Sequence, residues 1–244
     1  LVNEIVRIGG KCILFDPTGE FTGKVAGAQE FEFSNDQAAE GRLVRFPSEK
    51  LSELDLNALL RPTGQSQGPT LRSAIISLRL ARLLLADPVR FPQHAVEGSD
   101  ALRIEVQHNN QTVGFIHLDE NRTVSKANQH RKPLGRAQLT LADQLAADDC
   151  DFKVLSNQIG KECLFPANAD GTFGGVDPRQ VGYNNTLVIR IETLLNSPDM
   201  SCFFSQDGLD ICAEIEAFLD DQHARALVLS FENVSFKHNA RELL

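Results

Sequence analysis

The sequence predicts an α/β protein in which a strand-bearing segment at each end of the chain flanks a large, mostly helical insertion. Two apolar runs lead to this prediction: Lys11–Phe15 near the start of the chain and Ala226–Phe231 near its end. The first run is almost wholly apolar, as are strands that are buried on both faces of a parallel sheet, and the second is a sheet-like run. Helical periodicity prevails between them. The chain therefore divides into residues 1–60, 61–223 and 224–244.

Residues 1–60 are expected to form a helix and then several strands. Apolar residues lie at helical spacing up to Ile8, and Gly9-Gly10 supply the left-handed residue that ends a helix. The strand Lys11–Phe15 follows and stops at the turn sequence Asp16-Pro17-Thr18-Gly19-Glu20-Phe21. Shorter β-prone runs occur at Glu30–Phe33 and Leu43–Phe46.

Residues 61–223 read as mainly helical. One helix has its apolar face on Leu71, Ala74, Ile75, Leu78, Ala81 and Leu85, and Asp87-Pro88 closes it. Other helical patterns cover Gln138–Ala147, Asp151–Leu164, Asn184–Asn196 and Leu209–Gln222, and Ala167–Pro178 is a polar loop. A hairpin is expected where Leu102–Val106 faces Thr112–Leu118 across His108-Asn109-Asn110.

Residues 224–244 return to a strand, Ala226–Phe231. Asn233 or Ser235 then supplies a cap for a last helix that runs to Leu244.

Composition excludes several classes of function. The chain has 24 basic and 33 acidic residues and a net charge of −9, so its overall field repels polyanions and any nucleic-acid contact needs a local basic patch. No apolar stretch has the length of a membrane span. The five cysteines never have C-x-x-C spacing, which favours buried thiols in a cytoplasmic protein over a disulfide scaffold. The six histidines also lack metal-ligand spacing.

A near-match to a phosphate-binding loop occurs at Gly19–Val25. That loop needs four residues between its glycines and a hydroxyl residue after its lysine. Here only three residues separate Gly19 from Gly23, and Val25 stands in the hydroxyl position. This segment is therefore not a P-loop.

Asp16 and Glu20 follow directly after the first predicted strand. Ligands of open α/β sheets bind beyond the carboxyl ends of the strands, so these carboxylates are candidates to hold a Mg²⁺-bound water or to orient a nucleophilic water. The alternative is that Asp16 caps a turn and Glu20 is simply solvated.

The clearest basic run is the segment from Arg122 to Arg136, which contains no acidic residue. It is a candidate for phosphate contact, with a solvated connector as the alternative. Its cations are Arg122, Lys126, Arg131, Lys132 and Arg136. A second set of arginines, Arg72, Arg79 and Arg82, shares one helix face and could meet DNA, an acidic neighbour or solvent.

Three segments of the sequence resemble motifs of one known family, and the third resemblance is weaker than the other two. Asp16-Pro17-Thr18-Gly19-Glu20-Phe21 resembles the D-P-x-G-E-[FY] motif of the HerA-like ATPases, with Thr18 in place of the commoner His or Ser. The segment from Leu60 to Pro69, followed by Leu71-Arg72 and Ala74, is similar to the P-S-G-Q-S-Q-x-P-K-L-x-x-A segment that opens the helical insertion of bacterial members. Leu227–Ser230 with Ala240–Leu244 is similar to the strand and helix before the Walker B strand.

The resemblance implies a partial RecA-like P-loop ATPase sheet with a large helical insertion. It implies a hexameric, ATP- and Mg²⁺-dependent DNA translocase or helicase, acting in DNA processing or antiviral defence beside a nuclease or a Sir2-like partner. The P-loop is expected upstream of Leu1, and the Walker B strand, sensor and arginine finger beyond Leu244. Of the family's nucleotide-site residues, Asp16 and Glu20 carry over, and the resemblance favours a role for them near the nucleotide.

A rival hypothesis is a mostly helical interaction module without catalysis of its own. A G-x-x-x-x-G-K-[ST] sequence within about 20 residues before Leu1 favours the motor, and its absence favours the module. On either hypothesis, we expect this 244-residue piece alone neither to bind nor to hydrolyse ATP, because it contains no P-loop.

Overall fold

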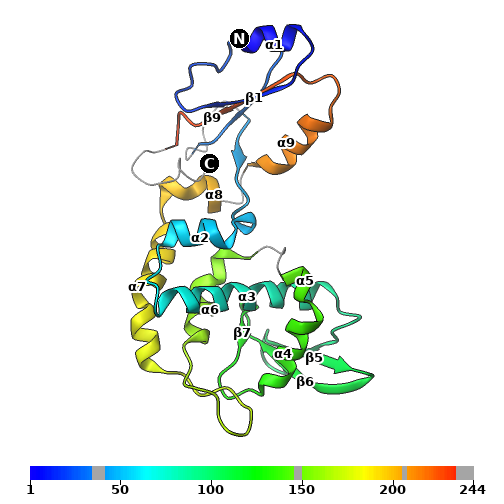
Figure 1. Cartoon of the computed structure of the whole chain (residues 1–244), viewed down its shortest axis with the longest axis vertical. Helices are drawn as coiled ribbons and strands as arrows, with labels where there is room; N and C mark the ends of the chain where they lie inside the picture. The colour runs from blue at the N-terminus through cyan, green and yellow to red at the C-terminus, as the bar shows by residue number, and fades with distance from the viewer. Residues whose placement is uncertain (35–41, 146–149, 205–207, 235–244) are drawn as a thin grey trace. The chain divides into compact units, whose positions relative to one another are not determined.

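The computed structural model describes residues 1–34, 42–145, 150–204 and 208–234, and it is a mixed α/β structure (Figure 1). The chain forms two compact units. Unit 1 consists of residues 1–48 with 193–244, and unit 2 of residues 49–192. Each is described by itself below. The boundaries therefore fall at residues 48 and 192, whereas the sequence-based division places them at 60 and 223.

The central feature of unit 1 is a parallel sheet with the strand order β1-β9-β2 (Figure 1). Its strands are β1 (Cys12–Asp16), β9 (Ala226–Ser230) and β2 (Gln29–Glu32). All five residues of β9 are buried, because β9 has a strand on either side. Helix α1 (Val2–Arg7) packs Val2 and Val6 against a cluster with Val228. The predicted helix and terminal strands are thus confirmed, and the two ends of the chain share one sheet.

The expectation that the strand Lys11–Phe15 is buried on both faces is wrong. Its first three residues are only half-buried, and Phe15 is 55% exposed. The reason is position: β1 lies at the edge of the described sheet, and β9 lies at its centre. An apolar run alone does not distinguish a central strand from an edge strand.

The remainder of unit 1 consists of short elements. They are β3 (Val44–Arg45) paired with β8 (Leu209–Asp210), the 3₁₀ turn η3 (Pro198–Met200), α8 (Ser201–Phe204) and α9 (Ile211–Asp220). Asp210 caps α9 by accepting a hydrogen bond of 2.8 Å from the backbone N–H of Cys212, so this helix starts later than the predicted Leu209. Lys11 donates to the carbonyl oxygens of Phe218 and Leu219 at the end of α9, at 2.9 and 2.7 Å. These bonds are one reason why α9 belongs with the sheet rather than with the insertion. The predicted last helix lies outside the described residues.

Unit 2 contains an antiparallel sheet with the strand order β4-β5-β6-β7. The strands are β4 (Gln93–Ala95), β5 (Leu102–His108), β6 (Gln111–Leu118) and β7 (Val124–Ser125). The predicted hairpin is confirmed: Asn109 and Asn110 connect β5 to β6 with φ angles of 51° and 60°, as a two-residue type I′ turn requires. The two outer strands were not predicted, because two or three residues are too few to show alternation.

The helical elements between residues 48 and 195 complete this part of the chain. They are η1 (Ser48–Lys50), α2 (Glu53–Leu60), α3 (Gln67–Ala86), α4 (Arg131–Thr140), α5 (Ala142–Leu145), η2 (Phe152–Val154), α6 (Leu155–Glu162) and α7 (Pro178–Leu195). The predicted helix 138–147 corresponds to the end of α4 and to α5, and residues 146–149 are not described. The insertion is therefore a helix-and-sheet unit rather than a mainly helical one.

One hydrophobic core holds the sheet of unit 2 to α3 and α4. It includes Leu80 and Leu84 of α3, and the inward residues of the hairpin and of α4: Ile104, Val106, Ile116, Leu118, Leu134 and Ala137. Alternate residues of β5 and β6 face this core, as a half-buried sheet requires. None of the helices in the described ranges has the length and apolar character of a membrane span.

Candidate functional site

The carboxyl edge of the parallel sheet in unit 1 is the site that the sequence indicated. Because the three strands are parallel, their carboxyl ends meet at one edge. The register pairs Asp16 of β1 with Ser230 of β9, and Ser230 in turn with Glu32 of β2. Three strand ends thus contribute polar side chains to one rim of the sheet.

Asp16 is completely buried, and both of its carboxylate oxygens accept hydrogen bonds from the following turn. Oδ1 accepts the backbone N–H of Glu20 at 3.1 Å, and Oδ2 accepts that of Phe21 at 2.8 Å. The carboxylate therefore caps the turn, as one of the two sequence interpretations proposed. It shapes the loop and presents no oxygen to a metal ion.

Glu20 lies at the surface of this loop. Among the residues that the structure describes, no donor binds its carboxylate, which leaves both oxygens accessible to water or to a cation. Asp16 and Glu20 thus take different places: Asp16 is buried and fixes the loop, and Glu20 is the exposed carboxylate that this loop carries.

Sequence reasoning missed Glu232, which lies over the same loop. A side chain at Gly19 would place its Cβ 1.9 Å from Oε2 of Glu232, and Gly19 has a φ of +73°. The positive φ favours glycine at this position, and the Glu232 carboxylate would have to move to admit a side chain there. A signal was present in the sequence, because Glu232 follows the apolar run of β9 much as Asp16 follows that of β1. Nearby, the side-chain amide of Asn233 donates a hydrogen bond to Oε1 of Glu32.

The rim does not by itself fit a bound Mg·ATP. The described residues include no group of three or more His, Cys, Asp or Glu side chains that could hold a metal ion. Each oxygen of the buried Asp16 carboxylate already accepts a backbone N–H, and the segment Gly19–Val25 lacks the spacing of a phosphate-binding loop.

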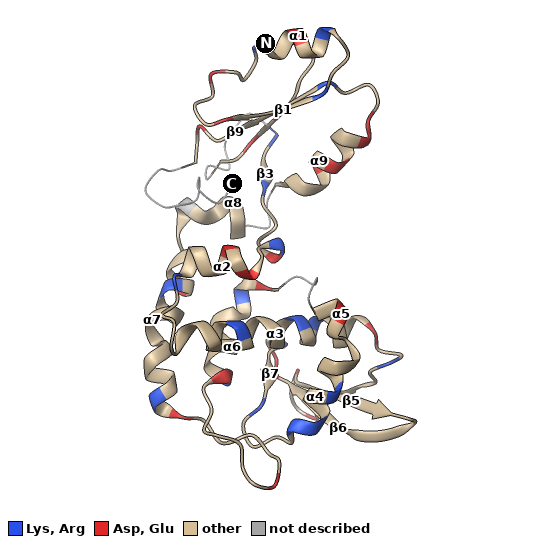
Figure 2. Cartoon of the chain, in the orientation of Figure 1, with Lys and Arg blue, Asp and Glu red and all other residues tan. Residues whose placement is uncertain are grey.

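The structure places the five cations of the basic segment in four different surroundings. Arg122 lies in the turn before β7, and its guanidinium donates to the carbonyl oxygen of Asp100 at 2.8 Å. Arg136 on α4 contacts Nδ1 of His108 at 2.6 Å. Arg131 and Lys132 are exposed at the start of α4, where Figure 2 shows basic residues on the first turn.

Lys126 departs from the prediction that all five cations contact a phosphate. Its side chain is 8% exposed, and its ammonium forms an ion pair of 2.5 Å with Glu162, whose side chain is 6% exposed. A DNA contact by Lys126 would break this buried pair. The set that faces solvent therefore centres on Arg131 and Lys132.

The arginine stripe on α3 is also engaged within unit 2. Arg72 pairs with Glu53 of α2 at 3.6 Å, and Arg79 donates to the carbonyl oxygen of Leu145 of α5 at 3.3 Å. These bonds tie α3 to two neighbouring helices. They favour a structural use of the stripe.

The segment before α3, which carries the second family resemblance, is fixed by Gln67. This side chain is buried; its Oε1 accepts the backbone N–H of Thr63 at 3.1 Å, and its Nε2 donates to Oγ1 of Thr186 at 2.7 Å. Nε2 also reaches the carbonyl oxygen of Tyr183 at 3.1 Å. Gln67 thereby closes the loop and joins α3 to α7.

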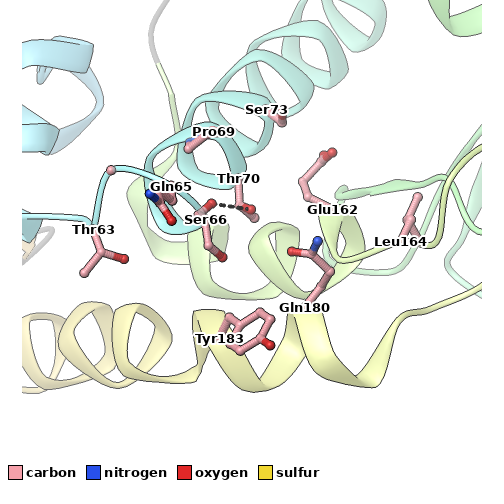
Figure 3. Close-up of a pocket in the computed structure, with 11 residues that line it drawn as sticks. Thr63, Gln65, Ser66, Pro69, Thr70, Ser73, Glu162, Leu164, Gln180 and Tyr183 are labelled. Carbon is pink, nitrogen blue, oxygen red and sulfur yellow. Dashed lines mark hydrogen bonds between the residues drawn. The ribbon is translucent and has the colours of Figure 1, made fainter.

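This loop borders a polar cavity of about 830 Å³ between α3, α6 and α7 (Figure 3). Its walls carry hydroxyl and amide side chains from Thr63, Gln65, Ser66, Thr70, Ser73, Gln180 and Tyr183. The carboxylate of Glu162 also borders it, but Lys126 neutralises that charge, and Ser77 and Gln158 donate to its Oε1 at 2.7 and 2.8 Å. The cavity therefore presents neutral hydrogen-bonding groups.

No protein-family model matches the sequence, and no curated protein matches it significantly. The resemblance to the HerA-like ATPases therefore rests on the motifs quoted above.

Proposed function

We propose that this chain is part of an ATP-driven DNA translocase or helicase of the HerA type, with a partial RecA-like sheet in unit 1 and unit 2 as its insertion. The observation that carries the proposal is the Asp16 turn. The D-P-x-G-E-like sequence lies at the carboxyl edge of a parallel sheet, where α/β proteins bind ligands.

In this proposal the two acidic residues have separate roles. Asp16 is a positioning residue, because it acts through the loop that it caps. Glu20 is the candidate catalytic residue, which orients or polarises the attacking water. ATP and Mg²⁺ are bound mainly by the P-loop and Walker B residues that we expect outside this chain, in a cytoplasmic hexamer that works with DNA and with a nuclease or Sir2-like partner.

Steady-state ATP hydrolysis by the full-length protein tests these roles. We expect Glu20→Gln to lower kcat at least about tenfold, equivalent to about 1.4 kcal/mol of barrier, and Asp16→Asn to lower it similarly by loosening the loop. Glu216→Gln, on the exposed face of α9, is the matched control and keeps wild-type turnover. Wild-type kcat in both Asp16→Asn and Glu20→Gln refutes the assignment.

The chain alone is expected to bind Mg·ATP more weakly than about 1 mM, that is with less than about 4 kcal/mol. The reason is the poor fit of the rim to a nucleotide, as described above. Isothermal titration calorimetry of the 244-residue chain measures this, and micromolar affinity contradicts our placement of the nucleotide site.

The DNA contact is proposed for Arg131 and Lys132. Replacing both by Glu should weaken DNA binding equally on all sequences, and reduce the slope of log affinity against log salt by about one unit for each phosphate that these side chains neutralise. Unchanged affinity and slope, together with an unchanged hexamer, would identify the segment as a solvated connector.

A non-catalytic interaction module is the second candidate. It is favoured by the continuity of unit 2, which has its own sheet and core within residues 49–192. Absence of ATPase activity in the full-length protein, with a partner bound through unit 2, would support the module over the motor.

A further inference from the structure

A second cavity of unit 2, of about 390 Å³, lies beside β6 and the start of α4. It exists because β7 pairs only with His117 and Leu118, so that the earlier part of β6 has no described strand on this side. Gly114 of β6 allows α4 to approach closely: a Cβ at this position would lie 2.7 Å from Cγ of Pro133. The edge of β6 and the start of α4 thus form two walls of this cavity.

The polar side chains of this cavity carry hydrogen-bond donors and no carboxylate. They are the ammonium of Lys132, the imidazoles of His117 and His130, and the side-chain amide of Gln129; the other lining residues are Val113, Gly114, Phe115 and Pro133. The chain has a net charge of −9, but the lining of this cavity contributes no acidic side chain.

Two acidic side chains near this cavity, Asp170 and Glu105, already accept hydrogen bonds. Asp170, which interacts with the charge of His130, accepts the backbone N–H and the hydroxyl of Thr172 at 2.9 and 2.7 Å. Glu105, whose strand position faces Phe115, accepts hydrogen bonds from Thr112, Gln107 and His94. These bonds hold both carboxylates in contacts outside the cavity.

His117 adds a donor without adding a charge. Burial lowers its pKa below the usual value, and the charge of Arg103, directly opposite on β5, lowers it further. The imidazole is therefore neutral at pH 7, with one N–H and one lone pair. Arg103 itself stacks on Phe115 at 4.3 Å and contributes a positive field on this face of the hairpin.

We propose that this cavity binds a phosphate group, with Lys132 as its charged ligand and with Gln129, His130 and His117 as further hydrogen-bond donors. A tetrahedral oxyanion suits donors that come from a strand, a loop and a helix, because its oxygens point in different directions. The phosphate belongs either to a nucleic-acid backbone or to a small phosphorylated molecule. Only the first source rests on the proposed function.

Phosphate binding is measured directly on the 244-residue chain. Inorganic phosphate is titrated at constant ionic strength against chloride, and the ring resonances of His117 and His130 are followed by NMR. We expect saturable shifts of both rings and an increase in the pKa of His117, because a bound anion favours the protonated ring. Absence of saturation at these two rings overturns the proposal.

Two matched charge-removing variants test the role of Lys132. Lys132→Gln should weaken phosphate binding at least about tenfold, which corresponds to about 1.4 kcal/mol. Lys153→Gln removes the same charge from an exposed lysine that does not line the cavity, and it should leave affinity unchanged. If the two variants weaken phosphate binding equally, the binding depends only on the overall charge of the chain, and the proposed phosphate site is refuted.

Measuring the affinity of the same two variants for duplex DNA distinguishes the two sources of the phosphate. Loss of duplex DNA affinity in Lys132→Gln, but not in Lys153→Gln, supports the site and assigns it to the DNA backbone. Unchanged DNA affinity with weakened phosphate binding supports the site and assigns it to a small phosphorylated ligand. Asp16→Asn should leave phosphate binding intact, so failure of the ATPase proposal and failure of this one are separate results.

Discussion

The sheets of the two units are built from the chain in opposite ways. In unit 1 the central strand β9 pairs with β1, so that Ala226 lies beside Cys12, and all three strands are parallel. In unit 2 each strand pairs with the next one along the chain, and two residues join β5 to β6. The sheet of unit 2 therefore forms from strands that are neighbours in the sequence, whereas the sheet of unit 1 depends on pairing between distant parts of the sequence.

The two units also differ in the partners of their buried charged side chains. In unit 1, the acidic residues Asp16 and Glu32 end their strands at the carboxyl rim of the sheet, and the buried carboxylate of Asp16 accepts hydrogen bonds from backbone N–H groups. Unit 2 instead buries a lysine against a glutamate, with Ser77 and Gln158 completing the network. The stability of unit 2 should therefore be more sensitive to removal of a single charge.

Of the variants considered, Glu162→Gln is expected to cause the largest difference in stability between the two units. It leaves the ammonium of Lys126 buried without a counter-charge, which typically costs about 3–5 kcal/mol. Hydrogen exchange followed by mass spectrometry should show the destabilisation in the peptides of unit 2 and not in those of unit 1. The fluorescence of Tyr183, the single tyrosine in a chain without tryptophan, is a second probe of unit 2.

The double variant Lys126→Met with Glu162→Leu is the control for that prediction. It removes both charges and replaces them by apolar side chains of similar size, so most of the stability should return. A double variant as unstable as Glu162→Gln would show that packing, rather than the unpaired charge, dominates at this site.

Leu229→Ala should have the next largest effect, and in the other unit. Leu229 is 1% exposed in the central strand and lies between Phe15 and Phe31 in the register. The reduced burial and the new cavity should lower the free energy of unfolding by about 2–5 kcal/mol in unit 1 alone. Leu219→Ala, at a residue 55% exposed on α9, is the control and should change stability by less than about 0.5 kcal/mol. Equal destabilisation of both units would contradict their independence.

A smaller effect is expected at the hairpin turn of unit 2. Asn110 has a φ of 60°, a conformation that asparagine tolerates and alanine does not. Asn110→Ala should lower the stability of unit 2 by about 1 kcal/mol, whereas Asn110→Gly should not lower it, because glycine suits a type I′ turn. Denaturant unfolding curves of the two variants measure the difference, and coincident curves would mean that the turn conformation is not maintained.

Thiol labelling tests the packing of unit 1 without any substitution. The five cysteines form no disulfide; Cys12 and Cys212 of unit 1 are partly exposed, and Cys150, Cys163 and Cys202 are buried. Burial raises the pKa of Cys202 to about 12 and also raises that of Cys163. At pH 8 we expect Cys12 and Cys212 to react first, and Cys202 to react only when unit 1 unfolds. Rapid reaction of Cys202 in the native chain would show that its packing is loose.

Local patterns in the sequence predicted the elements that local interactions define. Gly9-Gly10 correctly predicted the end of α1, and Asp87-Pro88 the end of α3. The Asn109-Asn110 turn correctly predicted the hairpin. The sequence also carries a signal for α2 that the prediction did not use: Ser52 and Asp55 form a reciprocal capping box at its start. The exposure of β1 could not be predicted, because it depends on which strand takes the centre of the sheet.

The candidate site shows the same division. Asp16 and Glu20 could be placed at a strand end from sequence alone, since the motif adjoins an apolar run. That Asp16 faces inward and Glu20 outward depends on the turn geometry, and the approach of Glu232 to Gly19 depends on the distant pairing of β9 with β1. The basic segment was visible as composition, but the burial of Lys126 depends on Glu162, which lies on another element.

The central place of β9 has a consequence for biosynthesis. A ribosome that adds about 5–20 residues per second needs roughly 10–40 s to proceed from the end of β2 to the start of β9, and throughout that interval β1 and β2 have no strand between them. Unit 2 is complete before then and is able to fold while the nascent chain is still growing. Chaperones that shield apolar segments at the ribosome should accordingly engage β1 and β2 longest, and should leave them when Leu227–Leu229 emerge from the exit tunnel.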